Sequence, residues 1–320
     1  MENQGNETSK DESWERRTLE KLAQDVLKEQ RTKRRWGIFF KLAVISYLVA
    51  VLVLVVDWGH PEKLADRKHT AVVHLHGTIE AKGDASAENI VASLQAAFED
   101  KRTVGVVLRI NSPGGSPVQS GIIHDEIRRL RGKFPDIPLH AVVEDICASG
   151  GYYVAAAADK IYVDKASIVG SIGVLMDGFG FTGSMDKLGV ERRLLTAGDN
   201  KGFMDPFSPQ DSTQRQHAQT LLNDIHQQFI TVVREGRGKR LKDNPEVFSG
   251  LMWTGAQSVQ LGLADGFGTV DSIARDVFKA EKTLDYSVRE NIAERFAKRL
   301  GADMAKSLTL RLFGEGPAIR

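Results

Sequence analysis

Residues 104–131 read VGVVLRINSPGGSPVQSGIIHDEIRRLR. The first seven form an apolar run typical of a buried strand, and the last fourteen place Ile123, Ile127 and Leu130 at helical spacing. Between them, the turn NSPGGSP combines proline with glycine, the residues that most often interrupt regular structure. The stretch therefore predicts a strand, a tight turn and a helix in immediate succession.

The same alternation continues on both sides of this unit. Strands are expected at 71–77, 138–144, 160–164 and 190–196, and helices at 85–100, at 151–158 and from Ser208 to about Gly236. Strands that alternate with helices predict an α/β layered fold. A chain of 320 residues, 42% hydrophobic and 27% charged, is long enough for one or two domains with a core.

Composition excludes several classes of partner and cofactor. The net charge of +1 and the lack of a nucleic-acid-reading motif predict no nucleic-acid partner. The only cysteine, Cys147, cannot form an intrachain disulfide and is expected to be a small buried side chain. His74 and His76 alternate on one strand, but no third ligand of matching pattern follows, so we expect structural histidines, no metal and no cofactor.

Residues 36–56 form the most apolar segment, with Lys41 as the only charge. Twenty-one helical residues span roughly 30 Å, the thickness of a bilayer core, which favours a transmembrane anchor over a buried core helix. Residues 21–35 carry six Lys or Arg and residues 57–71 carry three. The basic side stays in the cytoplasm, so the larger C-terminal part is expected outside a bacterial-type inner membrane. No small-x-small cleavage site follows, so we expect an uncleaved single-pass anchor.

These patterns predict five regions. They are a cytoplasmic segment at 1–35, the anchor at 36–56, a linker at 57–69, an α/β catalytic domain at 70–280 and a helical tail at 281–320. In the tail, apolar positions from 290 to 313 have helical spacing that Gly301 interrupts, which leaves two short helices and a mobile tail as alternatives.

Ser149 lies in the stretch EDICASGGYY (144–153), where a strand is expected to turn into a helix. A hydroxyl at a helix N-terminus sits beside backbone N–H groups that favour developing negative charge, so Ser149 is a candidate nucleophile. An ordinary helix-capping serine is the alternative. The turn at Gly114 and Gly115, together with Gly150, offers N–H groups for an oxyanion hole; a plain tight connection is the alternative there. The turn lacks the G-x-x-x-x-G-K-[ST] pattern of a phosphate-binding loop.

As a nucleophile, Ser149 also needs a base that takes the proton of its hydroxyl. No histidine occurs between His140 and His217. Lys201, in the loop TAGDNKGFMDPF (196–207), is a candidate, with Ser171 in IVGSIGV (168–174) as a hydrogen-bonding partner for its amine. A lysine amine acts as a base only when it is neutral, which requires a water-poor site. A solvated loop lysine is the alternative.

Four ordered motifs resemble one family. They are NSPGG, ASGGYY, GSIGV and a G-x-x-K loop ending in DPF, within a region from about Thr70 to Phe278. This pattern is similar to that of the signal peptide peptidase SppA/SohB family, membrane-bound serine peptidases with a Ser/Lys dyad on the ClpP/crotonase fold of repeated β-β-α units. The resemblance, to the short single-unit form, implies that Ser149 is the nucleophile, that Lys201 is the base and that Ser171 orients the lysine.

The resemblance also implies a biological setting. It implies a membrane-anchored endopeptidase that degrades released signal peptides and other apolar peptides at the bilayer. It further implies a ring-like homo-oligomer, in which Lys201 can come from a neighbouring protomer. Two other classes stay open: a crotonase-like acyl-CoA enzyme, which would not need Ser149 or an export anchor, and a non-enzymatic membrane scaffold on a peptidase fold.

Overall fold

The computed structural model describes residues 28, 33–50 and 67–288. The chain divides into two compact units, Met1–Ala65 and Asp66–Arg320. In the first unit, residues 33–50 form a helix. Of the helices within these described ranges, none has the length and apolarity that crossing a membrane requires. The last part of the predicted anchor, residues 51–56, lies outside the described residues, as does most of the predicted tail.

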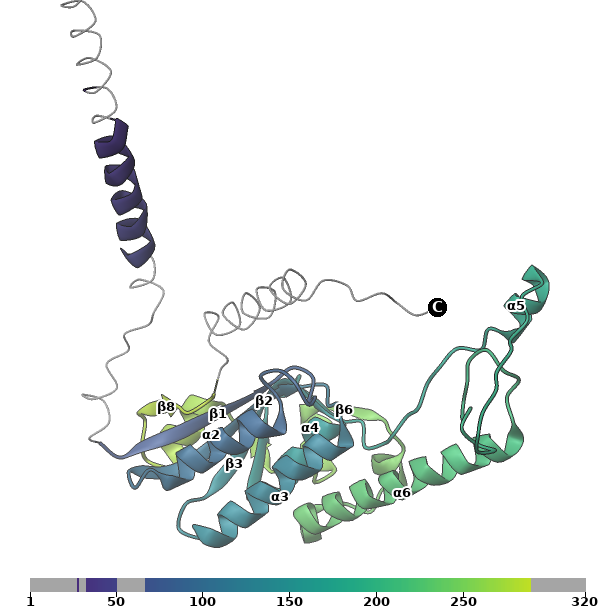
Figure 1. The fold of residues 1–320 in the computed structure, drawn as a ribbon. Coiled ribbons are helices and arrows are strands. Elements are labelled where there is room, and N and C mark those ends of the chain that lie inside the picture. Colours follow the sequence, from purple (N-terminus) through teal and green to yellow (C-terminus); the bar gives the residue numbers. More distant parts are fainter. Residues whose placement is uncertain (1–27, 29–32, 51–66, 289–320) are drawn as a thin grey trace, which may run out of the picture. The chain divides into compact units, whose positions relative to one another are not determined.

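The second unit is built on an eight-stranded sheet (Figure 1). Its strands are β1 (His69–His76), β2 (Thr103–Ser112), β3 (Leu139–Ala148), β4 (Lys160–Val163), β5 (Ile168–Gly170), β6 (Met252–Thr254), β7 (Gly266–Phe267) and β8 (Thr283–Asp285). The order is β6-β5-β3-β2-β1-β8, and β4 pairs with both β3 and β7. All pairs are parallel except β5 with β6, which is antiparallel. The predicted α/β class is confirmed.

The described part of the second unit also contains helices, which lie between its strands in the sequence. They are α2 (Ala87–Glu99), α3 (Pro117–Lys133), α4 (Gly150–Ala155), α5 (Thr182–Leu188), α6 (Ser212–Arg237), α7 (Gly255–Gln260) and α8 (Val270–Ser272), with short helical turns at Gly238–Arg240, Pro245–Phe248 and Ile273–Val277. Helices α2 and α3 cover one face of the central strands (Figure 1). The main core lies between them and the sheet, where Leu94 and Ile127 are fully buried with Leu75 and Leu108.

The opposite face of the sheet is only partly covered. There, Val72, Val107 and Val142 form a small second cluster with Ile273, and Phe278 packs against it. The covering segment therefore comes from α8 and the turn that follows it. Because consecutive strand residues point to opposite faces, the pattern of alternating apolar residues in β1 to β3 supplies both clusters.

Two sequence expectations fail between β5 and α6. The strand expected at 190–196 is absent: the segment is irregular and exposed, and Arg193 pairs with Glu191 two residues away. No strand of the sheet pairs with this segment, so its apolar residues gain nothing from an extended conformation. The long helix is capped by Asp211, whose carboxylate accepts from Gln214 N at 2.9 Å, and not by Ser208, whose hydroxyl donates to Asp205 instead.

Candidate active site

Ser149 joins the end of β3 to the start of α4 in a conformation that few non-glycine residues adopt. Its φ is 50° and its ψ is −123°, and its N–H donates to Gly170 O at 2.9 Å. It occupies the N-cap position, yet its side chain makes no capping hydrogen bond. The capping alternative therefore fails. Strained backbone of this kind costs on the order of 1–3 kcal/mol and concentrates at functional sites.

Ser149 lines a cavity of about 420 Å³. The walls are largely apolar and come from three parts of the chain: Tyr153 on α4, Val174 and Leu175 after β5, and Ile225 and Phe229 on α6. The rings of Tyr153 and Phe229 lie 5.1 Å apart. A concave, mostly apolar site with a few hydroxyls is the usual form of a small-ligand or peptide-binding pocket.

Two amide N–H groups accompany Ser149 in this cavity. Gly115 and Gly150 both line it, and neither N–H has a hydrogen-bond acceptor within residues 67–288. Gly114 differs, because its N–H donates to Ser112 Oγ at 3.2 Å and it does not line the cavity. Of the three glycines expected to form an oxyanion hole, the geometry favours Gly115 and Gly150.

Ser171 lines the same cavity, as its predicted role requires. It follows β5 directly and also has a positive φ, 50°. Its N–H donates to Leu251 O at 2.8 Å, and Nε2 of His226, which is on α6, lies 3.1 Å from Ile172 O. The turn that carries Ser171 is thus held by two elements that are distant in sequence.

Lys201 does not join this group in the single chain. Its side chain is exposed, and the residue does not line the cavity. Among the described residues that line the cavity, none is a lysine, a histidine or an acid. One chain therefore brings together Ser149, Ser171 and the two glycines but leaves the base outside.

The remaining candidate residues have structural environments. Cys147 is fully buried, and this burial raises the pKa of its thiol, so it is not a nucleophile at neutral pH. His74 and His76 share one strand face, as expected, with ring centroids 5.7 Å apart. Each lies beside a carboxylate: His76 Nε2 is 2.6 Å from Glu144 and His74 Nε2 is 3.8 Å from Asp285.

Sequence reasoning missed the contribution of α6. Ile225 and Phe229 form a wall of the cavity, and His226 between them supports the Ser171 turn. The spacing of Ile225 and Phe229, four residues apart, was a signal for one helix face. Nothing in that spacing indicates which cavity the face meets, because the contact depends on tertiary packing.

The chain is similar to proteins named as peptidases or proteases. A model described as peptidase family S49 matches residues 133–285. A "Putative signal peptide peptidase SppA" of Enterococcus faecium is 30% identical over 237 residues, which are 72% of this chain and 68% of that protein. A "Probable protease SohB" of Haemophilus influenzae is 29% identical over 243 residues, 74% of this chain and 67% of that protein.

A third relative is much longer than this chain. A Brucella melitensis protein named "Na(+)/H(+) antiporter NhaA" is 44% identical over 212 residues, which are 65% of this chain but only 29% of that protein. The chain thus spans less than a third of this relative, and the antiporter name describes the longer protein.

The class that the fold, the cavity and these matches define is that of a peptidase. The chain belongs to peptidase family S49, and the expected resemblance to SppA and SohB is confirmed. Ser149, Ser171 and Lys201 all fall within the matched residues. The matches give no support to the acyl-CoA enzyme or to the non-enzymatic scaffold.

Proposed function

We propose that this chain is a membrane-anchored serine endopeptidase in which Ser149 is the nucleophile and Lys201 is the general base. The observation that supports the nucleophile best is the conformation of Ser149. It lies in a strained turn with no capping bond, inside a cavity that also contains two amide N–H groups with no acceptor among residues 67–288. Keeping a strained serine at this place is unfavourable for folding alone, so a catalytic role accounts for it.

The reaction proceeds through an acyl-enzyme. Neutral Lys201 Nζ takes the proton from Ser149 Oγ, and Oγ bonds to the carbonyl carbon of the scissile peptide. The N–H groups of Gly115 and Gly150 donate to the resulting oxyanion, each worth roughly 3 kcal/mol of transition-state stabilisation. When the C–N bond breaks, the lysine ammonium returns the proton to the leaving amine. The lysine, neutral again, takes a proton from water as the water oxygen bonds to the ester carbonyl carbon. When the C–Oγ bond breaks, the lysine ammonium returns this proton to Ser149 Oγ and the acid product leaves.

Lys201 must reach this cavity from outside the single-chain arrangement. The segment that carries it has strongly exposed apolar side chains, including Leu195 at 96% and Phe179 at 81% exposure. Exposed apolar surface of this kind favours protein–protein contact. We therefore propose a ring-like homo-oligomer in which this segment packs on a neighbouring copy and delivers Lys201 to the neighbour's Ser149. Ser171 then holds the lysine amine by a hydrogen bond.

The substrates proposed are extended apolar peptides, with released signal peptides foremost. The apolar walls of the cavity support this choice. Strand β6 lies at an edge of the sheet, and Met252 on it is 57% exposed. An extended peptide can add to such an edge through backbone hydrogen bonds.

The membrane anchor is part of the same proposal. The apolar run 36–56 continues beyond the helix described at 33–50, and the basic residues before it favour a cytoplasmic N-terminus. The catalytic unit then lies outside the cytoplasm at the inner membrane, with the bilayer itself as a partner. Resistance of the full chain to extraction by alkaline carbonate tests this part, and release of the chain into the supernatant would contradict it.

The catalytic proposal is tested by labelling and by cleavage. The full chain should react with a fluorophosphonate probe and cleave a signal peptide, whereas Ser149→Ala should do neither while keeping the thermal stability of the wild type. A Ser149→Ala variant that retains cleavage would assign the nucleophile elsewhere.

A further inference from the structure

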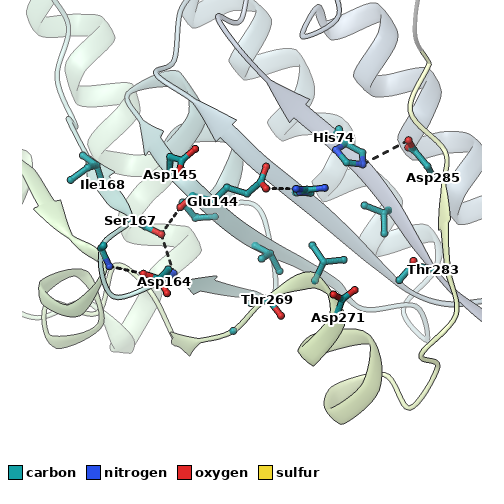
Figure 2. Close-up of a pocket in the computed structure, with 17 residues that line it drawn as sticks. His74, Glu144, Asp145, Asp164, Ser167, Ile168, Thr269, Asp271, Thr283 and Asp285 are labelled. Carbon is teal, nitrogen blue, oxygen red and sulfur yellow. Dashed lines mark hydrogen bonds and ion pairs between the residues drawn. The ribbon is translucent and has the colours of Figure 1, made fainter.

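A second cavity, of about 750 Å³, lies on the sheet face that α2 and α3 do not cover. Figure 2 shows it between His74 and Asp285 on one side and Asp164 and Ser167 on the other. It shares no lining residue with the Ser149 cavity. A smaller cavity of about 370 Å³ continues it, because both are lined by His74 and Arg109. We call the two together the acidic groove.

The acidic groove is strongly negative in a chain of net charge +1. Its carboxylates are Asp84, Glu144, Asp145, Asp164, Asp271 and Asp285. Arg109 is the one Lys or Arg among its lining residues, and it pairs with Glu144. Asp145 accepts from the Asn111 amide at 2.8 Å and Asp164 accepts from Ala166 N at 2.9 Å, so each of these two carboxylates accepts from an uncharged donor.

Between the carboxylates, the floor of the groove is apolar. Val72, Val142, Ile168 and Val270 all line it. An occupant that matches this surface has an apolar stripe flanked by cationic side chains. A simple cation would leave the floor unused, and an uncharged apolar segment would not match the excess of acidic over basic residues that line the groove.

The chain itself supplies a segment of this kind beside the groove. After β8, the backbone follows β1: Tyr286 N donates to Val72 O at 2.9 Å and His74 N donates to Ser287 Oγ at 2.9 Å. Ser287 and Val288 line the smaller cavity, and Val288 is 43% exposed. The described part of the structure thus ends at Val288, at the edge of the groove, and residues 289–320 lie outside it.

The composition of residues 289–320 complements the groove. The segment has seven basic residues against four acidic ones, and its basic residues are Arg289, Arg295, Lys298, Arg299, Lys306, Arg311 and Arg320. Apolar residues recur every four positions at Ile292, Phe296, Leu300, Met304 and Leu308. From β8 to β4 the groove crosses four strand spacings, about 19 Å, and even as a helix the first 16 residues span about 24 Å.

We propose that residues 289–320 bind in the acidic groove of their own chain, with the apolar stripe on its floor and the basic residues against its carboxylates. This segment then covers the part of the sheet that α8 leaves open. The interaction is independent of the peptidase reaction, because it uses no residue of the Ser149 cavity.

Crosslinking in the full chain tests the proposal. Ala166 is exposed and lines the groove, whereas Ala96 is exposed on α2, which covers the opposite face. The double variant Ala166→Cys with Ala297→Cys should crosslink within one chain at least about fivefold faster than Ala96→Cys with Ala297→Cys, when treated with a short bis-maleimide. The native Cys147 is fully buried and does not compete.

Charge-reversal variants test whether electrostatic attraction between residues 289–320 and the acidic groove brings the two cysteines together. Asp145→Lys with Asp271→Lys should slow the crosslinking by about fivefold, as should 0.5 M NaCl, which shortens the screening length to about 4 Å. Asp136→Lys, an exposed reversal in the loop after α3, should have no effect. Adding Lys298→Glu and Arg299→Glu to the groove reversal should restore the rate.

Three results would overturn the proposal. They are equal crosslinking at Ala96 and Ala166, insensitivity to the groove reversals in a variant whose unfolding midpoint is unchanged, and crosslinks that form only between two chains. The readout does not use peptidase activity, so it stands or fails separately from the assignment of Ser149.

Discussion

Gly114 lies against the first turn of α4, so that a Cβ on Gly114 would be 2.6 Å from the amide nitrogen of Gly150 and 2.8 Å from Ala148 O. Gly114 also has a φ of +100°, which L side chains rarely adopt. The turn after β2 is thereby held directly against the turn after β3. Gly115 N lies 3.3 Å from the position that a Cβ on Gly150 would occupy, so the two glycines that line the cavity are close together.

Gly114→Ala should therefore destroy the proposed oxyanion hole. A methyl group at this position must push the two turns apart, and we expect peptidase activity to fall at least about a hundredfold, the loss typical of one missing donor. The free energy of unfolding should fall by about 1–3 kcal/mol. Gly132→Ala, in the last turn of α3 with open space around it, is the matched control and should raise stability by roughly 0.5–1 kcal/mol. Full activity in Gly114→Ala would contradict the assignment.

Two substitutions of Ser171 separate the effect of its hydroxyl from the effect of its strained backbone. Ser171→Gly removes both the hydroxyl and the strain of the positive φ, whereas Ser171→Ala removes the hydroxyl alone. If the hydroxyl holds the lysine amine, both variants should lose activity to the same extent. Stability in Ser171→Gly should change by less than about 1 kcal/mol, because relief of strain offsets the flexibility of glycine. Unchanged kcat in both variants would show that the hydroxyl is dispensable.

The buried His140 on β3 should make the stability of the fold sensitive to acid. It is 5% exposed, its Nδ1 has no hydrogen-bond partner, and burial lowers its pKa to about 4. In the unfolded chain its pKa is about 6.5, so below that pH the unfolded state binds more protons. Stability contributed by the neutral ring is complete above pH 6.5 and is lost as the pH falls toward 4, by up to about 3 kcal/mol.

His140→Phe should remove this part of the pH dependence. The ring lies 4.9 Å from that of Phe278, so an aromatic replacement keeps the packing. Urea unfolding of the two proteins at pH 7 and pH 4.5 measures the difference. Parallel losses of stability in wild type and variant would mean that His140 does not titrate between those values.

Tyr286, which directly follows β8, contacts Asp100 and His69, two residues far from it in the sequence. Its hydroxyl donates to Asp100 at 2.7 Å and lies 2.9 Å from His69 Nε2, and burial raises its pKa to about 12. Tyr286→Phe should lower the free energy of unfolding by about 1.5–3 kcal/mol, as expected for a hydrogen bond to a charged group. Tyr162→Phe is the control, because the Tyr162 hydroxyl has no hydrogen-bond partner among residues 67–288. Equal effects of the two substitutions would contradict the role of the Asp100 contact.

The central α/β unit could be predicted from the sequence because local and tertiary preferences agree there. The strand expected at 104–110 is found at Thr103–Ser112, and the helix expected at 118–131 is found at Pro117–Lys133. In these elements apolar periodicity, the Pro-Gly-Gly turn and the Ser116 cap all point to one structure. The strand expected at 190–196 failed because a short apolar alternation becomes a strand only when another strand pairs with it.

Some residues of the candidate site could likewise be predicted from the sequence, and others could not. Ser149 and the Gly114–Gly115 turn could be predicted because each lies where an expected strand ends, and parallel strands bring such ends to one edge of a sheet. Ser171 was a candidate through its motif alone, because no strand was expected at Ile168–Gly170. The wall from α6 could not be predicted, because it depends on how a helix far along the chain packs. The approach of Lys201 to Ser149 could not be read from the sequence either, and it stays a prediction.

Catalysis at the proposed site requires that Lys201 of one copy serves Ser149 of another. Ser149→Ala and Lys201→Ala are each expected to be inactive, and Lys201→Arg should not rescue activity, because arginine does not act as a base. When the two alanine variants are co-assembled at equal amounts, sites that combine Ser149 of one copy with Lys201 of the next are intact, and about a quarter of wild-type signal-peptide cleavage should return in a ring with heterologous contacts. Cleavage that stays at the level of the separate variants in verified mixed assemblies would contradict a shared site.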